Sequence, residues 1–271
     1  MSPEEWEGFL LAVTERVRRK VSPLAKKGNR GRALGVGASG DRTIYADKAA
    51  EDEIIMSLRK AGPVRILSEE AGMLGDARAA ALAVVDPLDG SSNFERGIPF
   101  YCTSVAIVEG GRTKVGVVRD LVTGDAYSAA DRRGARKNGG RIRTSRTRDL
   151  SEAVIGVDLS RGGSQMAGTV APLVGASKRL VHLGANALEL CYLAEGKTDA
   201  FVDLRGRMRI TDMAAACLIA AEAGAVVSRP DGEPLSPEFD LSHRLSFVAS
   251  ANGGLHKQIL ELAKEPSARQ S

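Results

Sequence analysis

The most informative stretch of the sequence reads Val84-Val85-Asp86-Pro87-Leu88-Asp89-Gly90-Ser91-Ser92-Asn93. It closes an apolar run that predicts a short buried strand over Ala81–Val85. In a tight turn after this strand, Asp86 and Asp89 can point at one place, and the Leu88 carbonyl can join them. Hard oxygen ligands in such a cluster suit Mg²⁺. The alternative interpretation is an Asx-type turn whose carboxylates are merely solvated.

The same turn offers a place for phosphate. Gly90 lets the backbone approach a ligand closely, because glycine carries no side chain. The backbone amides of Gly90 and Ser91 could then cradle an anion. This stretch therefore predicts a metal site beside a phosphate site.

Two further acidic residues occur where a strand ends or a helix begins. Glu69 follows a predicted strand over Val64–Leu67, and ligands in α/β folds bind at such strand ends. Asp212 is expected at the N-cap of a helix over Met213–Ala223, whose small first residues permit close packing against another element. Both residues also have a simpler explanation, which is a charged loop for Glu69 and an ordinary helix cap for Asp212.

The hydrophobic pattern along the rest of the chain predicts alternating helices and strands. Expected helices cover Pro3–Lys27, the residues from Asp47 (at the expected N-cap position) to Gly62, 164–174, 186–195 and Leu255–Lys264. Expected strands cover Thr43–Tyr45, Val64–Leu67, Ala81–Val85 (stopped by Pro87), Thr103–Val108, Lys114–Val118, Ala126–Ala129, Val154–Val157, Leu180–Leu183, Asp199–Asp203, Ala225–Ser228 and Ser246–Ala249. Gly28–Gly40 is expected to be a surface loop, and Asn138-Gly139 predicts a type I′ hairpin.

Early antiparallel strands followed by strand–helix alternation predict a mixed α/β fold, layered as an αβαβα sandwich. We expect one unit over residues 1–271, with a weak boundary near residue 150 between a metal- and phosphate-binding half (1–150) and a substrate half (151–271). A chain of 271 residues is long enough for one large domain or two intimately packed ones.

Composition excludes several classes of protein. Hydrophobic residues make up 43% and charged residues 27%, which excludes a disordered or fibrous chain. No apolar run approaches the length that a bilayer requires, and the first residues lack the pattern of a signal peptide, so we expect a cytoplasmic protein. The 3 cysteines and 3 histidines show no disulfide or zinc spacing, so a metal must bind to oxygen.

The net charge of +4 is concentrated between Arg132 and Arg148. A basic surface of this kind attracts nucleic acid, but it attracts small phosphorylated molecules equally well. No aromatic residue interrupts this run, which makes nucleic acid the less favoured partner.

Several motifs together resemble the inositol monophosphatase superfamily. DPLDGSSNFERGIPFYCTSVAI (86–107) resembles its first signature, and TDMAAACLIAAEAGAVV (211–227) resembles its second. SEE (68–70) stands where the family usually has GEE, and GARKNGGRIRTS (134–145) is similar to its hairpin. The wording of residues 187–212 is closest to the archaeal-type branch, whose members resemble both inositol monophosphatase and fructose-1,6-bisphosphatase. The resemblance covers Asp41 to Asn252 and implies a sandwich of the sugar phosphatase type.

The resemblance also implies roles for particular residues. The implied metal ligands are Glu69, Asp86, the Leu88 carbonyl, Asp89 and Asp212, holding two or three Mg²⁺ ions, with Mn²⁺ as an alternative. Ser91 and Glu69 are implied to orient the attacking water, and Asp47 to assist at an outer metal. The phosphate is implied to lie on Asp89, Gly90 and Ser91. The metals would neutralise the phosphate and activate water for in-line attack, so no histidine or cysteine nucleophile is needed.

This sequence departs from the family pattern at a few positions. Thr211 replaces the tryptophan before Asp212, and Ala215 and Cys217 replace glycines. These changes concern packing behind the metal, so they leave the expected reaction class unchanged. They do weaken the close analogy to the substrates of the animal enzymes.

Basic residues in the second half favour a substrate with a second phosphate. Arg205, Arg207 and Arg209 alternate along one segment, and Lys178-Arg179 precede the strand near Leu180. Asp203 matches the family position that often binds a sugar hydroxyl. We therefore expect a phosphatase of carbohydrate metabolism, in gluconeogenesis, that converts fructose 1,6-bisphosphate to fructose 6-phosphate and also hydrolyses inositol 1-phosphate. A solvated basic edge is the alternative for the arginines, and a turn residue is the alternative for Asp203.

Other functions remain open from the sequence alone. They are a dedicated inositol monophosphatase, a 3′-phosphoadenosine 5′-phosphate phosphatase, a basic nucleic-acid-binding module that uses Arg132–Arg148, and a scaffold without activity. The nucleotide phosphatase is less favoured because it needs a base-stacking pocket and aromatic residues make up only 4% of the chain. The family habit implies a homodimer or homotetramer.

Overall fold

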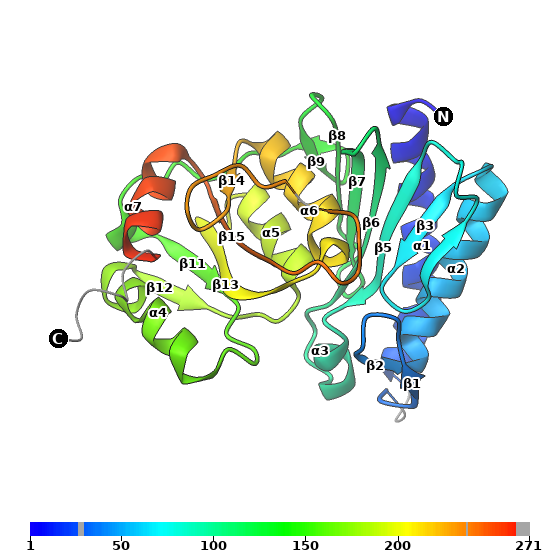
Figure 1. Cartoon of the computed structure of the whole chain (residues 1–271), viewed down its shortest axis with the longest axis horizontal. Helices are drawn as coiled ribbons and strands as arrows, with labels where there is room; N and C mark the ends of the chain where they lie inside the picture. Colours follow the sequence, from blue (N-terminus) through cyan, green and yellow to red (C-terminus); the bar gives the residue numbers. More distant parts are fainter. Residues whose placement is uncertain (27–29, 237, 264–271) are drawn as a thin grey trace.

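The computed structural model describes residues 1–26, 30–236 and 238–263, and it forms alternating layers of helices and sheets (Figure 1). The helices are α1 (Pro3–Lys26), α2 (Tyr45–Ala61), α3 (Ser91–Arg96), α4 (Gly163–Ala176), α5 (Asn186–Ala194), α6 (Ile210–Ala223) and α7 (Gly253–Ala263), with a 3₁₀ turn at Leu150–Glu152. No described helix has the length and apolar character needed to cross a membrane.

The first half of the chain builds the larger sheet. Its eight strands lie in the order β10 (Gly140–Arg141), β9 (Ala135–Lys137), β8 (Ala126–Ala130), β7 (Arg112–Asp120), β6 (Cys102–Glu109), β5 (Leu82–Asp89), β3 (Arg65–Ser68) and β4 (Gly72–Gly75). Only β3 and β5 run parallel, so their carboxyl ends meet at the same edge of the sheet. A separate hairpin pairs β1 (Ala33–Val36) with β2 (Arg42–Ile44).

The second half of the chain builds a five-stranded sheet. The strand order is β12 (Arg179–Val181), β11 (Val154–Val157), β13 (Ala200–Met208), β15 (Leu245–Ser250) and β14 (Val226–Ser228). The first three run parallel and the last two pair antiparallel. Helices α4 and α7 cover its outer face through a small apolar core, while α1 and α2 cover the outer face of the larger sheet.

Helices α5 and α6 lie between the two sheets and share one apolar core with both (Figure 1). Small residues let the layers approach closely. A Cβ atom on Gly116 of β7 would lie 2.7 Å from the carbonyl oxygen of Ala215 in α6, so strand and helix touch backbone to backbone. This contact sets how close the start of α6 comes to the ends of β3 and β5.

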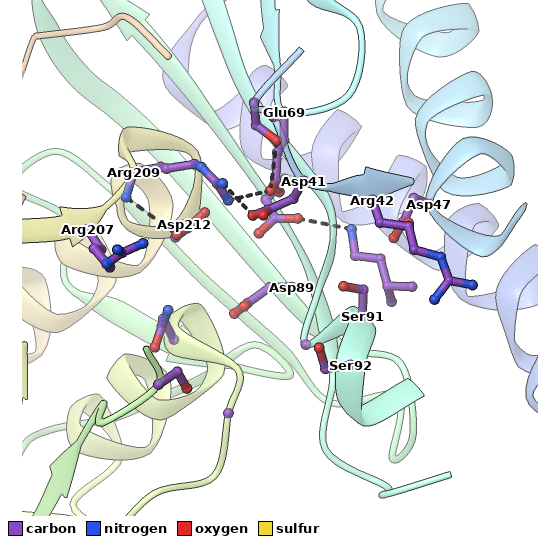
Figure 2. A pocket seen from close by; sticks show the side chains of 18 of the residues that line it. Asp41, Arg42, Asp47, Glu69, Asp89, Ser91, Ser92, Arg207, Arg209 and Asp212 are labelled. Carbon is purple, nitrogen blue, oxygen red and sulfur yellow. Dashed lines mark hydrogen bonds and ion pairs between the residues drawn. The ribbon is translucent and has the colours of Figure 1, made fainter. Parts of the chain in front are cut away.

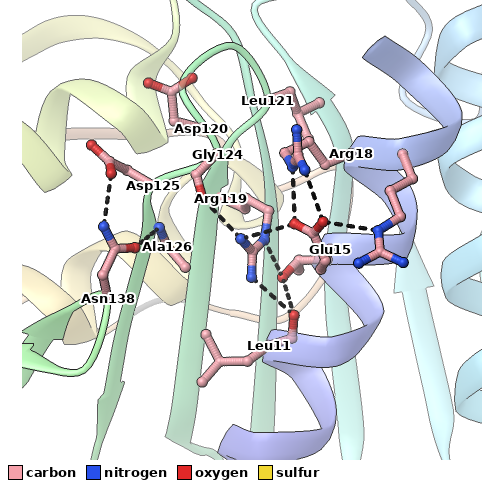
Figure 3. A network of polar contacts seen from close by, with 12 residues as sticks. Leu11, Glu15, Arg18, Arg119, Asp120, Leu121, Gly124, Asp125, Ala126 and Asn138 are labelled. Atoms are coloured by element: carbon pink, nitrogen blue, oxygen red, sulfur yellow. Dashed lines mark hydrogen bonds and ion pairs between the residues drawn. The ribbon is translucent and has the colours of Figure 1, made fainter. Parts of the chain in front are cut away.

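A buried arginine fastens α1 to the larger sheet (Figure 3). Arg119 of β7 donates from Nε to Thr14 Oγ1 (3.1 Å) and from Nη2 to the Leu11 carbonyl (3.0 Å). Its Nη1 donates to the Gly124 carbonyl (2.9 Å) and lies 3.3 Å from the Glu15 carboxylate. The guanidinium therefore finds acceptors for its own buried donors and links two residues of α1 to the loop after β7.

The predicted αβαβα fold is confirmed, and most predicted elements are present with small differences at their ends. Asn138 (φ 51°) and Gly139 (φ 82°) form the predicted turn, between β9 and β10. The predicted ends at Lys27, Gly28 and Lys264 lie outside the described residues. Residues near 150 lie between the last strand of one sheet and the first of the other, and a boundary there stays a prediction.

Three local predictions were wrong. β5 does not stop at Pro87 but runs on to Asp89, because a bulge between Asp86 and Asp89 accommodates the proline. The glycine-rich loop contains the exposed strand β1. Asp47 and Asp212 are not N-caps, because each lies in the first turn of its helix, three residues after the true caps Ile44 and Arg209.

Replacing Arg119 tests the attachment of α1. Arg119→Met takes away the guanidinium donor of the Gly124 carbonyl and of Thr14 Oγ1 and one charge partner of Glu15, so we expect the free energy of unfolding to fall by about 1–3 kcal/mol. Arg18→Met removes another partner of Glu15 whose side chain is 32% exposed, and it should cost less than about 1 kcal/mol. Urea denaturation compares the two variants, and equal losses would contradict this role of Arg119.

Candidate active site

A cavity of about 610 Å³ opens where the two halves of the chain meet. The β1–β2 loop, the ends of β3 and β5, and the start of α3 contribute one side. The loop after β11, the start of α5, the end of β13 and the start of α6 contribute the other. Figure 2 shows charged side chains from both sides converging on this space.

Three carboxylates form a cluster in the cavity. Glu69, Asp86 and Asp212 each offer one oxygen atom, and these atoms all lie within 4.8 Å of one another. Asp86 and Asp212 are buried, and Glu69 is nearly so. They come from the end of β3, from β5 and from the first turn of α6, so residues far apart in the sequence are brought together as predicted.

The cluster is electrostatically strained in the absence of a counter-charge. Burial raises the pKa values of Glu69, Asp86 and Asp212 above those of free carboxyl groups. The negative charge of Asp212 raises the pKa of Glu69 further, and the charges of Glu69 and Asp89 do the same for Asp86. A set of carboxylates that resists ionisation in this way favours the binding of a cation.

Arg209, the N-cap residue of α6, supplies positive charge within the protein. Its Nη1 donates to Glu69 Oε1 at 2.7 Å, and its Nη2 forms an ion pair with Asp41 (Figure 2). Its backbone N–H reaches Asp212 Oδ2 across a long 3.4 Å bond. Arg209 thus joins the β1–β2 loop, the end of β3 and the start of α6.

Asp89 lines the same cavity but is held from the other side. Its Oδ2 accepts a hydrogen bond of 2.7 Å from the backbone N–H of Ala187 at the start of α5. The Cys102 thiol donates to the same oxygen at 3.5 Å. Burial and the nearby Asp212 charge raise the pKa of Asp89 to about 7. Leu88 also lines the cavity, beside Asp89.

The predicted phosphate residues lie at the start of α3. Gly90 adopts a left-handed conformation (φ 87°), and a Cβ atom there would lie 3.0 Å from the Phe100 carbonyl oxygen. Only glycine fits this position without strain. Ser91, the first residue of α3, lines the cavity together with Ser92 (Figure 2). The geometry leaves this backbone open toward the cavity.

Asp47 lines the cavity from α2 and is almost fully buried. Its Oδ2 accepts a 2.7 Å hydrogen bond from the backbone N–H of Ile44, which anchors the first turn of the helix. Burial raises the pKa of Asp47 to about 8 against the lowering effect of that bond, and the nearby Glu70 charge adds to the rise. A second, looser group of acids therefore borders the main cluster.

The predicted substrate residues divide into two groups. Arg205 lines the cavity, and so do its neighbours Arg207 and Arg209. Lys178 and Arg179 lie outside it, exposed at the edge strand β12, where Lys178 forms an ion pair with Glu152 at 3.1 Å. The prediction that these two contact the substrate is therefore corrected for this chain, because their position separates them from the cavity.

Asp203 does not reach the cavity either. It is fully buried, and its carboxylate accepts two hydrogen bonds from Arg205, through Nε at 3.0 Å and Nη2 at 2.5 Å. Asp158 also forms an ion pair with this guanidinium, with 2.7 Å between its Oδ2 and Arg205 Nη2. The expected contact between Asp203 and a sugar hydroxyl is therefore corrected to a structural role, in which Asp203 positions Arg205.

Several cavity residues were missed by the sequence analysis. They lie in loops, except for Arg42, which is the first residue of β2, and they are Asp41, Arg42, Glu70, Asp158, Ser160, Arg161 and Arg244. Asp41 and Arg161 lie 120 residues apart and form an ion pair of 3.1 Å. Asp41 follows a glycine-rich loop, which is a weak signal, and no local pattern marks the others.

The donor set fits a divalent metal ion. Carboxylate oxygens from Glu69, Asp86 and Asp212 are hard ligands at suitable mutual distances, and no histidine lines the cavity among the described residues. Such a set favours Mg²⁺, Mn²⁺ or Ca²⁺ over zinc or copper. The acidic cluster and the arginines beside it thus match the needs of phosphoryl transfer.

Comparisons with known proteins agree with this class of site. Residues 9–267 match the inositol monophosphatase family. The fructose-1,6-bisphosphatase/inositol-1-monophosphatase of Methanothermobacter thermautotrophicus is 37% identical over 271 residues, covering 94% of this chain and 95% of that protein. A protein of the same name from Archaeoglobus fulgidus is 38% identical over 258 residues, covering 93% of this chain and 95% of that protein.

The fold comparison leads to the same group. The crystal structure of an inositol monophosphatase–fructose 1,6-bisphosphatase superposes with a TM-score of 0.86 at 29% identity, covering 95% of this chain and 99% of the other. Fold and cavity therefore define a phosphatase of a metal-dependent class. The chain belongs to the inositol monophosphatase family.

The raised pKa of Asp89 predicts how stability depends on pH. Its folded value of about 7 lies above the ordinary 3.8, so between these values the folded chain holds a proton that the unfolded chain has released. Stability of the metal-free protein should therefore fall as pH rises from about 4 to 7. Thermal melts in chelator measure this fall, which should be smaller for Asp89→Asn.

Asp131→Asn is the matched control for these melts, because Asp131 is a partly exposed residue outside the cavity that pairs with Lys114. Its melting temperature should follow the wild-type pH curve. An Asp89→Asn curve as steep as the wild type would contradict the assigned charge strain.

Proposed function

We propose that this protein is a Mg²⁺-dependent phosphatase of small phosphorylated sugars and polyols. Its main reaction would convert fructose 1,6-bisphosphate to fructose 6-phosphate and phosphate, with inositol 1-phosphate as a second substrate. The observation that carries the proposal is one cavity holding the Glu69, Asp86 and Asp212 cluster together with several arginines. The names of the Methanothermobacter and Archaeoglobus relatives support both substrates.

Glu69, Asp86, Asp89, Asp212 and the Leu88 carbonyl would hold two or three metal ions, with Mn²⁺ able to replace Mg²⁺. When bound, these ions supply charge neutralisation for the phosphate and a water activated for in-line attack. The buried position of Asp86 and Asp212 keeps bulk water away from their carboxylates, which strengthens their interaction with a cation.

The remaining roles fall to backbone and side chains at the start of α3. Gly90 and Ser91 would receive the phosphate on their amides, because both residues line the cavity at the start of α3. Ser91 and Glu69 would orient the attacking water, and Asp47 would assist at the outer edge of the acidic group. Asp89, held by the Ala187 amide, would contact the same phosphate.

The arginines of the cavity differ in their availability for a second phosphate. Arg205 is bound by two carboxylates, from Asp203 and Asp158, so its charge is already balanced. Arg207 and Arg244 line the cavity and make no ion pair with the described part of the chain. An arginine without a carboxylate partner keeps its charge available for phosphate. Arg244 Nη1 already donates to the carbonyl oxygens of Leu241 and His243, so Arg207 is the better candidate.

A nucleotide phosphatase is a weaker alternative. No phenylalanine, tyrosine or tryptophan lines the cavity among the described residues, so 3′-phosphoadenosine 5′-phosphate would find no aromatic surface for its base. A dedicated inositol monophosphatase would have no use for unpaired arginines. Cytoplasmic location and assembly as a homodimer or homotetramer stay predictions.

Removing one carboxylate tests the metal assignment. Asp212→Asn deletes one charge of the cluster, so we expect kcat/KM to fall at least about 100-fold with Mg²⁺. Because metal binding stabilises the folded state, added Mg²⁺ should raise the melting temperature of the wild type and raise that of the variant much less. Phosphate release and thermal melts measure both, with Asp131→Asn as the control. Normal turnover and a normal melting shift in Asp212→Asn would disprove the assignment.

Replacing Arg207 tests the second-phosphate site. Loss of a charged hydrogen bond should reduce kcat/KM of Arg207→Gln for fructose 1,6-bisphosphate by about 10- to 100-fold. The effect on inositol 1-phosphate, which has one phosphate, should be at least ten times smaller. Arg141→Gln, an exposed arginine outside the cavity, is the control. Equal losses for both substrates would refute a site specific for the second phosphate.

A further inference from the structure

A sugar or polyol brings hydroxyl groups into the cavity, and these hydroxyls need hydrogen-bond acceptors on the protein. Asp203 is sealed below Arg205, so it cannot accept a hydrogen bond from a substrate hydroxyl. Arginines donate hydrogen bonds but never accept them. Asp158 also lines this side of the cavity, but its Oδ1 accepts from the Ser160 N–H and its Oδ2 pairs with Arg205. An acceptor for a substrate hydroxyl is therefore best sought among the other groups of the second-half side, which the loop after β11, the start of α5 and the end of β13 form.

Ser160 lies on that side, in the loop after β11, and it lines the cavity. Behind it stands His182, whose Nε2 lies 3.1 Å from Ser160 Oγ. The other ring nitrogen, Nδ1, lies 3.0 Å from the carbonyl oxygen of Val157. Two side chains and one backbone group thus form a short chain of hydrogen bonds that ends at the cavity.

The donor and acceptor groups in this series of hydrogen bonds decide the direction of each bond. The Val157 carbonyl can only accept, so His182 Nδ1 must carry a proton and donate it. In the neutral ring Nε2 then carries a lone pair and accepts the hydroxyl proton of Ser160. The single proton of Ser160 is therefore committed to His182, and only the lone pairs of its oxygen face the cavity.

The backbone of Ser160 is fixed by neighbouring charges. Its N–H donates to Asp158 Oδ1 at 2.8 Å, and its carbonyl accepts from Arg205 Nη1 at 2.9 Å. Asp158 and Arg205 are themselves paired at 2.7 Å, and Asp203 holds the same guanidinium. Asp158 and Arg205, with the buried Asp203 behind them, thus hold the backbone of Ser160 in place.

We propose that Ser160 is a specificity-determining residue that accepts a hydrogen bond from a hydroxyl of the sugar or polyol, and that His182 is the positioning residue that makes it an acceptor. This inference rests on the proposed function. A substrate without hydroxyls gains nothing from the contact, whereas a polyol phosphate gains affinity. A site built to bind a hydroxyl discriminates against molecules that lack one.

Two substrates separate this contact from general damage to the cavity. Inositol 1-phosphate carries hydroxyls, and p-nitrophenyl phosphate carries none outside its phosphate. Ser160→Ala should raise KM for inositol 1-phosphate by about five- to tenfold, the size of one hydrogen bond, with little change in kcat. KM for p-nitrophenyl phosphate should stay within about twofold, and Ser160→Thr, which keeps the hydroxyl, should restore most of the affinity for inositol 1-phosphate.

A double-mutant cycle tests the role of His182. His182→Phe frees the Ser160 proton, so the hydroxyl is no longer fixed as an acceptor, and KM for inositol 1-phosphate should rise by about two- to fivefold. Ser160→Ala combined with His182→Phe should be no worse than Ser160→Ala alone, because both changes remove the same contact. Additive effects of the two changes would overturn the positioning role.

Failure of the inference is distinguishable from failure of the proposed function. If the wild type hydrolyses inositol 1-phosphate and Ser160→Ala does so with the same KM, the inference is refuted and the proposed function stands. An equal rise in KM for both substrates would also refute it. If the wild type hydrolyses neither inositol 1-phosphate nor fructose 1,6-bisphosphate with Mg²⁺, the proposed function itself is refuted.

Discussion

Repulsion between buried carboxylates is the constraint on which the rest of this structure depends. Glu69, Asp86, Asp89 and Asp212 share one cavity, where burial from water makes their like charges costly. Such a group stays together only if rigid elements hold its members and positive charge offsets them. The parallel strands β3 and β5 and the start of α6 supply the rigid elements. The guanidinium of Arg209 supplies the positive charge. The acidity that strains the fold is also what gives the cavity its affinity for cations.

Much of the fold could be predicted because its signals are local. Hydrophobic alternation marked the antiparallel strands, and Asn138-Gly139 marked its hairpin through turn chemistry alone. Errors arose where tertiary structure overrides a local rule. A proline such as Pro87 would end most strands because it has no N–H to donate. β5 continues past it because Pro87 lies in a bulge, where no regular strand pairing is required. Asp47 and Asp212 resemble N-caps in the sequence, yet their helices begin two residues earlier.

The candidate site divides in the same way. Carboxylates that follow a strand or open a helix carry a recognisable pattern, so Glu69, Asp86 and Asp212 were placed correctly near one another. Loop residues such as Ser160 carry no such pattern, because their positions depend on pairings between distant parts of the chain. The same limit applies to Asp203, because the sequence alone does not show that this residue is buried and paired with Arg205.

The contact of Gly116 with Ala215 has a consequence for how the protein can change over time. A side chain on Gly116 would push α6 away from the larger sheet, and Asp212 lies in the first turn of that helix. A substitution far from the metal-binding residues can therefore change the activity of the enzyme. At this contact the metal-binding geometry depends on the absence of a side chain on Gly116 rather than on any charged group.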